Sequence, residues 1–128
     1  MFKRLRSLLG RSEPSAAAVP FDAPLTPGTR FFAIGDIHGH LPALKALEDR
    51  MASIDAEAVR VFVGDYIDRG DDSAGVLRHV HDLKLADPEH VICLKGNHEA
   101  MLLEFLDDPE AAGQSWLQYG GLQTLASF

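Results

Sequence analysis

Long hydrophobic runs and cysteines are both scarce in this sequence. The longest apolar stretches, such as Val61-Phe62-Val63 and Val91-Ile92-Cys93-Leu94, fall far short of the roughly 20 residues that a membrane-spanning helix requires. The single cysteine, Cys93, excludes an intramolecular disulfide, and its place in an apolar stretch favours a small buried side chain. We therefore expect a soluble protein of a reducing compartment such as the cytoplasm.

Basic residues are also scarce beyond the N-terminus. Lys3, Arg4, Arg6 and Arg11 give a charge of +4 to the first eleven residues, which leaves 8 basic against 19 acidic residues, or -11, for the rest. Such an acidic body repels the phosphates of nucleic acids and suits the capture of cations. A nucleic-acid partner is therefore not expected.

The length of 128 residues and the hydrophobic fraction of 46% are sufficient for one folded domain. Residues 1–11 place apolar side chains at roughly helical spacing among basic ones, which leaves open either a weak contact with a membrane surface or a frayed tail. Residues 12–29 are rich in proline and alanine and are interpreted as a linker. The ordered domain is expected to span residues 30–128.

That domain alternates between strand-like and helix-like patterns. Strands are predicted at 31–34, 59–63 and 91–94, and helices at 41–54, 73–83 and 98–106, with a further helical segment at 114–119. The resulting βαβαβα order implies parallel strands joined by helical crossovers and hence an α/β fold. The buried stripe of the first helix is expected to contain Leu44, Leu47, Met51 and Ile54, and Trp116 and Tyr119 are expected in the core.

Each predicted strand is followed by glycine and then by aspartate or asparagine. The three runs read GDIHG from Gly35, GDYIDRG from Gly64 and GNHE from Gly96. Because the carboxyl ends of parallel strands share one edge of a sheet, Asp36, Asp65 and Asn97 are expected to converge there.

The residue types at this edge favour divalent metal ions. Asp36 and His38 offer an oxygen and a nitrogen to one ion, and together with Asp65 they form a ligand set that suits Mn, Fe or Zn. Asp65 can bridge to a second ion, to which Asn97 offers its amide oxygen. Two ions about 3.5–4 Å apart can activate a water and stabilise both ends of an in-line displacement at phosphorus.

Three neighbouring residues fit the remaining tasks of such a reaction. The guanidinium of Arg69 matches two phosphate oxygens at once. His98 is placed to protonate the leaving oxygen as a general acid, and Asp68 is placed to hold the other ring nitrogen of His98.

Taken together, the GDIHG, GDYIDRG and GNHE runs resemble the signature motifs of the phosphoprotein phosphatase branch of the calcineurin-like metallophosphoesterase superfamily. The resemblance covers about residues 30–128, including a GGLQTL run from Gly120 that is similar to a stretch in bacterial members. It implies a β-sandwich flanked by helices and the metal-dependent hydrolysis of phosphate monoesters, typically on phosphoserine and phosphothreonine.

The resemblance also implies a role for each matching residue. It assigns one metal ion to Asp36, His38 and Asp65, the other to Asp65 and Asn97, the phosphate to Arg69 and Asn97, and acid catalysis to His98 paired with Asp68. Two divalent ions, Mn²⁺ first among them, are the implied cofactors.

The chain lacks one part of the family pattern. Members complete the second metal site with two histidines well downstream of GNHE, whereas no histidine follows His98 here. We therefore expect the N-terminal half of the sandwich, with reduced or no activity alone. Three functions stay open: a serine/threonine protein phosphatase acting on phosphoproteins or small phosphoesters, a hydrolase of dinucleoside polyphosphates such as diadenosine tetraphosphate, and a non-catalytic module that binds metal or phosphate.

Overall fold

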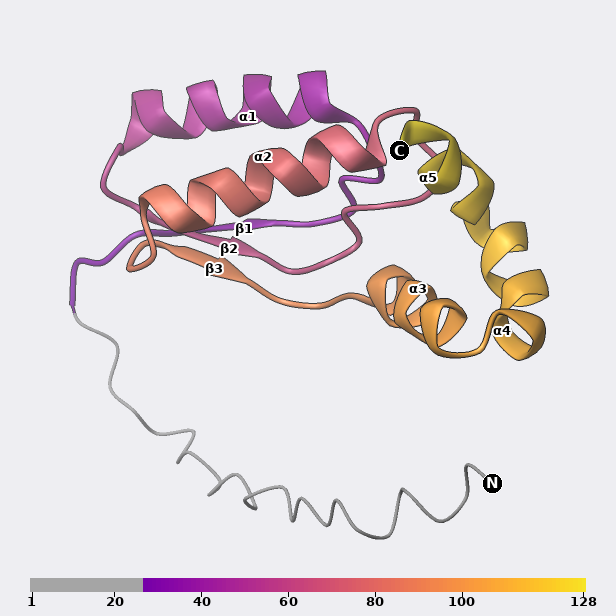
Figure 1. The fold of residues 1–128 in the computed structure, drawn as a ribbon. Coiled ribbons are helices and arrows are strands. Elements are labelled where there is room, and N and C mark those ends of the chain that lie inside the picture. Colours follow the sequence, from indigo (N-terminus) through magenta and orange to yellow (C-terminus); the bar gives the residue numbers. More distant parts are fainter. Residues whose placement is uncertain (1–26) are drawn as a thin grey trace, which may run out of the picture.

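Three short parallel strands form the base of the fold in the computed structural model, which describes residues 27–128. Strand β1 (Phe31–Ile34) pairs with β2 (Val59–Phe62), and β2 pairs with β3 (Val91–Cys93), so that the strand order follows the sequence (Figure 1). The predicted tail at 1–11 and most of the predicted linker at 12–29 lie outside the described residues.

Two helices connect these strands, and both cover the same face of the sheet (Figure 1). They are α1 (Leu41–Ile54) and α2 (Ser73–Ala86). Since right-handed crossovers that step in one direction along a sheet place their helices on one side, this arrangement follows from the strand order. The predicted α/β class, parallel strands and helical crossovers are confirmed. None of the described helices has the length and apolar character needed to cross a bilayer.

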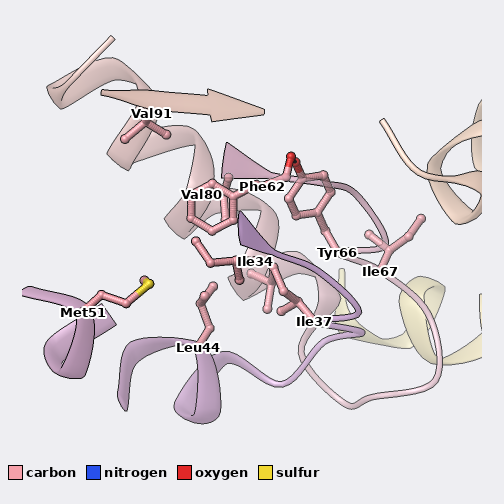
Figure 2. Packing of buried hydrophobic residues seen from close by; sticks show 10 residues of the cluster. Ile34, Ile37, Leu44, Met51, Phe62, Tyr66, Ile67, Val80 and Val91 are labelled. Atoms are coloured by element: carbon pink, nitrogen blue, oxygen red, sulfur yellow. The ribbon is translucent and has the colours of Figure 1, made fainter. Parts of the chain in front are cut away.

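The core lies between this sheet face and the two helices (Figure 2). Ile34, Phe62 and Val91 come from the three strands, and they pack with residues of α1 and α2, namely Leu44, Met51, Val76 and Val80. The loops that follow β1 and β2 contribute Ile37, Tyr66 and Ile67 to the same cluster. The apolar residues inside the GDIHG and GDYIDRG runs therefore anchor the loops that carry the candidate site.

Two predictions about buried side chains are wrong. Leu47 and Ile54 of α1 are 44% and 51% exposed, because the three-stranded sheet gives α1 only a narrow face to cover. Cys93 is exposed as well, since among residues 27–128 β3 lies at the edge of the sheet and pairs with β2 alone.

The opposite face of the sheet carries apolar side chains that no described element covers. This uncovered sheet face includes Phe31, Ile92 and the two residues that follow β2 and β3, Val63 and Leu94, all between 39% and 50% exposed. An apolar, uncovered face is what one layer of a sandwich presents to the next.

The chain beyond β3 forms a curved arm of helices, α3 (Asn97–Asp107), α4 (Pro109–Trp116), a π-helical turn (Leu117–Gly121) and α5 (Leu122–Ser127). We call residues 97–127 the C-terminal arm. Its last helix returns to the start of α2 (Figure 1). There Ser127 Oγ accepts a hydrogen bond of 3.0 Å from the backbone N–H of Ala74. The arm is more helical than expected, because Asp108 caps α4 by accepting from the Ala111 N–H.

Candidate metal and phosphate site

Backbone hydrogen bonds join the loops that follow β1 and β2 at the carboxyl edge of the sheet. The N–H of His38 donates to the carbonyl of Asp65 at 3.0 Å, and the N–H of Gly39 donates to the carbonyl of Tyr66 at 2.9 Å. Burial raises the pKa of Tyr66 well above its usual value, so its hydroxyl stays protonated and donates to the carbonyl of Leu94 at 2.8 Å. Main-chain hydrogen bonds thus hold the loops after β1 and β2 side by side.

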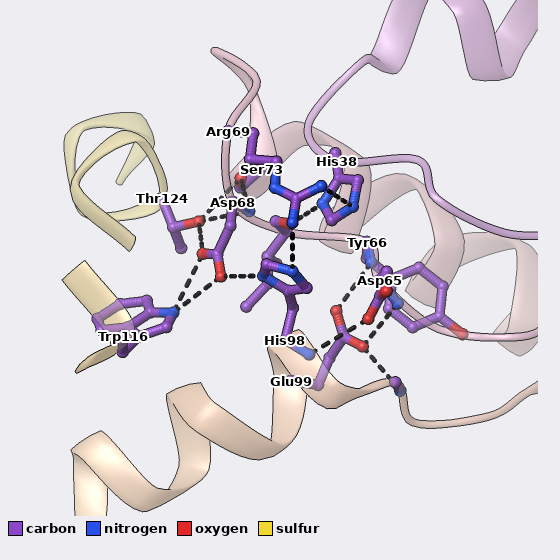
Figure 3. Close-up of polar contacts among 12 residues, drawn as sticks. His38, Asp65, Tyr66, Asp68, Arg69, Ser73, His98, Glu99, Trp116 and Thr124 are labelled. Atoms are coloured by element: carbon purple, nitrogen blue, oxygen red, sulfur yellow. Dashed lines mark hydrogen bonds and ion pairs between the residues drawn. The ribbon is translucent and has the colours of Figure 1, made fainter. Parts of the chain in front are cut away.

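Glu99 fastens the third loop to the second. Its Oε2 accepts from the N–H groups of Asp65 at 2.8 Å and Gly96 at 2.9 Å, and its Oε1 accepts from the N–H of Tyr66 at 2.8 Å (Figure 3). With both carboxylate oxygens engaged by the backbone, Glu99 acts as a structural clamp and has little capacity left for an ion.

Three side chains from the three loops gather their ligand atoms in one place. His38, Asp65 and His98 each offer one atom, and these atoms all lie within 4.8 Å of one another. The Nδ1 atom of His38 lies 2.7 Å from the carbonyl oxygen of Ile67. Since a carbonyl only accepts, Nδ1 carries the proton, and Nε2 has the lone pair with which His38 can bind an ion.

Asp36 stands apart from this cluster, although the sequence groups it with His38 and Asp65. Its carboxylate is 86% exposed, and its Oδ1 lies 3.9 Å from His38 Nε2. Two ligand atoms that each lie about 2.0–2.2 Å from one ion are separated by at most roughly 4.4 Å. Asp36 and His38 are therefore close enough to share an ion.

The Asn97 side chain faces Asp65. One terminal atom of its amide lies 3.3 Å from Oδ1 and 3.2 Å from Oδ2 of Asp65. An amide nitrogen at this place donates to the carboxylate, whereas an amide oxygen there lies beside the carboxylate around a shared cation. The spacing and the oxygen and nitrogen donors fit a hard or borderline divalent ion.

Arg69 spans the two histidines. Its guanidinium donates to Nε2 of His98 at 3.2 Å and lies 3.4 Å from Nε2 of His38 (Figure 3). Because a guanidinium only donates, Nε2 of His98 is the acceptor, so Nδ1 of His98 carries the ring proton. Arg69 is exposed as a residue, so its guanidinium is accessible to an anion from solvent.

Asp68 accepts a hydrogen bond from the Nδ1–H of His98 and lies at the centre of a buried polar cluster. His98 Nδ1 is 2.7 Å from Asp68 Oδ2, and neither side chain is more than 2% exposed. Trp116 Nε1 donates to the same carboxylate at 2.9 Å, and Thr124 Oγ1 donates to it at 2.6 Å (Figure 3). A buried carboxylate needs such donors, and here they come from the C-terminal arm.

Sequence reasoning missed these two contacts of Asp68. Trp116 is fully buried, as predicted, but its indole N–H serves the site, and Thr124 was not singled out at all. Tyr119, expected in the core, is 55% exposed. One sequence pattern could have indicated these contacts. Trp116, Gly120 and Thr124 are spaced four residues apart, which places them on one side of a helical segment.

The backbone itself is unusual at the site. Within residues 27–128, the non-glycine residues with positive φ are Asp36, His38, Asp65, Asp68 and Arg69, with values from 43° to 72°. Each such conformation costs about 1–3 kcal/mol and persists only where surrounding contacts enforce it. All five are residues that the sequence singled out for metal or phosphate chemistry.

Comparison with known proteins places this geometry in context. The family model described as calcineurin-like phosphoesterase matches residues 29–126. The chain is 38% identical over 72 residues to a symmetrical bis(5'-nucleosyl)-tetraphosphatase of Pseudomonas fluorescens, a match that covers 56% of this chain and 24% of that protein. It is 36% identical over 90 residues to serine/threonine-protein phosphatase 2 of Escherichia coli, which covers 70% of this chain and 38% of that protein.

A solved structure shows the same relationship. A protein serine/threonine phosphatase from Saccharomyces cerevisiae superposes with a TM-score of 0.52 at 29% identity, over 57% of this chain and 23% of the other. The chain thus spans between about a quarter and two fifths of the length of the curated relatives described above.

Proposed function

The chain belongs to the calcineurin-like phosphoesterase family, and on that premise we propose that its protein hydrolyses phosphate monoesters with two divalent metal ions, as a serine/threonine protein phosphatase. Mn²⁺ is the proposed ion, with Fe and Zn as alternatives that suit the same nitrogen and oxygen donors. The proposed location is the cytoplasm. The proposed substrate is a phosphoprotein or a small phosphoester.

One observation carries the proposal. The ligand atoms of His38, Asp65 and His98 gather within 4.8 Å, and the guanidinium of Arg69 lies against both histidines. A cation site with an anion-binding guanidinium beside it is what a metal-assisted phosphoesterase requires.

Each residue has a task in this proposal. His38, Asp65, Asp36 and Asn97 would hold the ions, which when bound supply an activated water and polarise the phosphoryl oxygens. Arg69 binds two phosphate oxygens and orients the ester for in-line attack. As Arg69 turns to the phosphate, Nε2 of His98 is released and takes up a proton from solvent. The imidazolium, stabilised by Asp68, gives this proton to the leaving oxygen.

The test measures Mn²⁺-dependent hydrolysis of an aryl phosphate by the full-length gene product. Asp65→Asn removes the carboxylate that both ions would share, and we expect loss of most of the activity. Asp82→Asn is the matched control, because Asp82 is 79% exposed on α2 and outside the site. A fully active Asp65→Asn protein would contradict the proposal.

A second candidate function is the hydrolysis of dinucleoside polyphosphates. It is favoured by the 38% identity to the symmetrical bis(5'-nucleosyl)-tetraphosphatase of P. fluorescens. The rates on a phosphoserine peptide and on diadenosine tetraphosphate separate the two: a higher kcat/KM on the nucleotide selects this candidate.

A third candidate is a module that binds metal or phosphate without turnover. It is favoured by the ligand atoms of His38, Asp65 and His98, which lie within 4.8 Å of one another and suffice to hold one ion. Tight binding of a single Mn²⁺ in calorimetry, with no hydrolysis of either substrate by the full-length gene product, would select it. Absence of Mn²⁺ binding would exclude it.

A further inference from the structure

The later part of the C-terminal arm, residues 116–124, touches the Asp68–Arg69 dipeptide at three positions that are four residues apart. Trp116 and Thr124 bind the carboxylate of Asp68, and the carbonyl of Gly120 accepts from the N–H of Arg69 at 3.3 Å. This part of the arm therefore contacts Asp68, which faces His98 (Figure 3). It also contacts Arg69, the proposed phosphate-binding residue.

Thr124 makes two different contacts with Asp68. Its hydroxyl donates to Asp68 Oδ1 at 2.6 Å, and its oxygen accepts from the backbone N–H of Asp68 at 2.8 Å. One side chain thus fixes both the carboxylate and the main chain of the same residue. The backbone N–H of Asp68 has a second acceptor in Ser73, at the start of α2. The Oγ of Ser73 lies 3.1 Å from the Asp68 nitrogen.

The backbone at these positions needs such support. Asp68 and Arg69 are consecutive residues with φ of 72° and 69°, a conformation that side chains other than glycine disfavour. Gly120, opposite them, has φ of 110°, and a Cβ atom there would come to 2.6 Å from the Arg69 nitrogen. Only glycine allows the arm to approach this closely.

Packing alone does not explain why residue 116 is a tryptophan, because its indole N–H also forms hydrogen bonds. Its ring lies against Phe105, with centroids 4.7 Å apart, and a phenyl ring could fill much of the same space. The indole N–H is aimed at Asp68, with 2.9 Å to Oδ2 and 3.2 Å to Oδ1. Together with Thr124 it leaves the carboxylate one well-defined direction in which to face His98.

We propose that Trp116, Gly120 and Thr124 are positioning residues for the phosphoester reaction. Trp116 and Thr124 hold Asp68 so that the His98 ring proton stays on Nδ1 and Nε2 faces the phosphate, while Gly120 holds the main chain of Arg69 so that its guanidinium reaches the same place. The inference rests on the proposed function for its catalytic meaning, but the orientation of His98 can be measured without any turnover.

The first test is therefore spectroscopic and uses the chain itself. In ¹⁵N-labelled protein, His98 is expected to give a slowly exchanging, downfield Nδ1–H signal, assigned by its loss in His98→Gln. Thr124→Val and Trp116→Phe should each weaken or shift this signal, and Thr124→Ser should restore it, because serine keeps the hydroxyl. An unchanged signal in both Thr124→Val and Trp116→Phe would overturn the proposal.

A matched control separates hydrogen bonding from packing. Phe105→Leu disturbs the ring that packs on Trp116 but leaves the indole N–H in place. It should lower the melting temperature and keep the His98 signal. If Trp116→Phe does not fold, the comparison of Thr124→Val with Thr124→Ser decides alone, and equal His98 signals in those two variants would overturn the role of Thr124.

The second test is kinetic and uses the full-length gene product. Loss of an orienting partner commonly costs roughly 10- to 100-fold in activity. We expect Thr124→Val and Trp116→Phe to lower kcat by about this factor while KM stays within about twofold, since they act through His98. Gly120→Ala should instead raise KM, because it displaces Arg69. Unchanged kcat in an active Thr124→Val enzyme would overturn the proposal.

The two tests fail in different ways. If the full-length protein hydrolyses no phosphate ester, the proposed function fails, and the His98 signal still decides whether the arm orients the ring. If the protein is active and the variants keep both the signal and the wild-type kcat, the positioning role fails while the function stands.

Discussion

The Nδ1 atom of His98 lies 2.7 Å from Oδ2 of Asp68, and the two side chains are 2% and 0% exposed. The contact joins the first turn of α3 to the loop after β2, across 30 residues of sequence. Because every other hydrogen-bond donor to this carboxylate also comes from a buried side chain, the pair behaves as one unit with the fold around it.

The first prediction concerns the charge of Asp68. Asp68→Asn keeps the shape but replaces one accepting oxygen with a donor that faces Trp116 or His98. We expect kcat of the full-length protein to fall by roughly 10²- to 10⁴-fold, because the His98 ring loses the partner that fixes its tautomer. Mn²⁺ affinity in calorimetry should change little. The control is Asp71→Asn in the same loop, where the side chain is exposed. A variant with wild-type kcat would contradict the assignment.

The second prediction concerns Glu99 and stability. Glu99→Gln leaves one accepting oxygen for the three backbone N–H groups of Asp65, Tyr66 and Gly96. At least one buried donor then loses its partner, and the free energy of unfolding should fall by about 1–3 kcal/mol. Urea denaturation measures the change. Glu104→Gln, on the exposed side of the same helix, should stay within about 0.5 kcal/mol; equal losses in both variants would argue against the clamp.

The third prediction concerns pH and the pair of Asp87 and His90. The hydrogen bond from the His90 ring lowers the pKa of Asp87 below its ordinary 3.8, and the same bond raises the pKa of His90 above its ordinary 6.5. The Asp87 contribution is present above pH 3.8 and is lost as the pH falls through the folded pKa. The His90 contribution is present below pH 6.5 and is lost as the pH rises through the folded pKa.

The pair should therefore stabilise the fold most at mildly acidic pH. The difference in melting temperature between wild type and His90→Gln is expected to peak near about pH 5 and to shrink on both sides. His81→Gln, whose ring is 69% exposed, serves as the control. If this difference in melting temperature keeps growing above neutral pH, the prediction is wrong, because the hydrogen bond would then stabilise the fold more when His90 is neutral.

The fourth prediction concerns the uncovered sheet face. An exposed apolar face of a sheet favours association between chains. The 128-residue chain is expected to self-associate with rising concentration, and Ile92→Thr combined with Val63→Thr should reduce this, as measured by light scattering after gel filtration. Leu85→Gln removes an exposed leucine on α2, outside this face, and should have little effect. If all variants associate equally, the sheet face is not the contact.

The strands and crossover helices were predictable because each depends on residues close in sequence. Alternation between apolar stretches and helical stripes located β1, β2, β3 and α1, with α1 matching at both ends. The sharing of one sheet edge by the strand ends predicted that Asp36, Asp65 and Asn97 meet. The structure brings Asn97 against Asp65 and leaves the Asp36 carboxylate 86% exposed, 3.9 Å from His38.

The contacts of the C-terminal arm could not be predicted in this way. Trp116 and Thr124 meet Asp68 across 48 and 56 residues, and no local pattern reveals which buried side chain a distant indole N–H or hydroxyl will reach. The orientation of Asp36 was equally hidden, because it depends on a backbone φ of 51° that its sequence does not favour.

The left-handed backbone at Asp36 places the proposed function and thermal stability in opposition. Glycine accepts positive φ without strain, so its substitution at Asp36, whose carboxylate is 86% exposed, would relieve roughly 1–2 kcal/mol of local cost while deleting a proposed metal ligand. Selection for heat resistance alone would favour this substitution and remove the ligand with it. An engineering campaign on this protein must therefore score activity in every round and seek added stability outside the site.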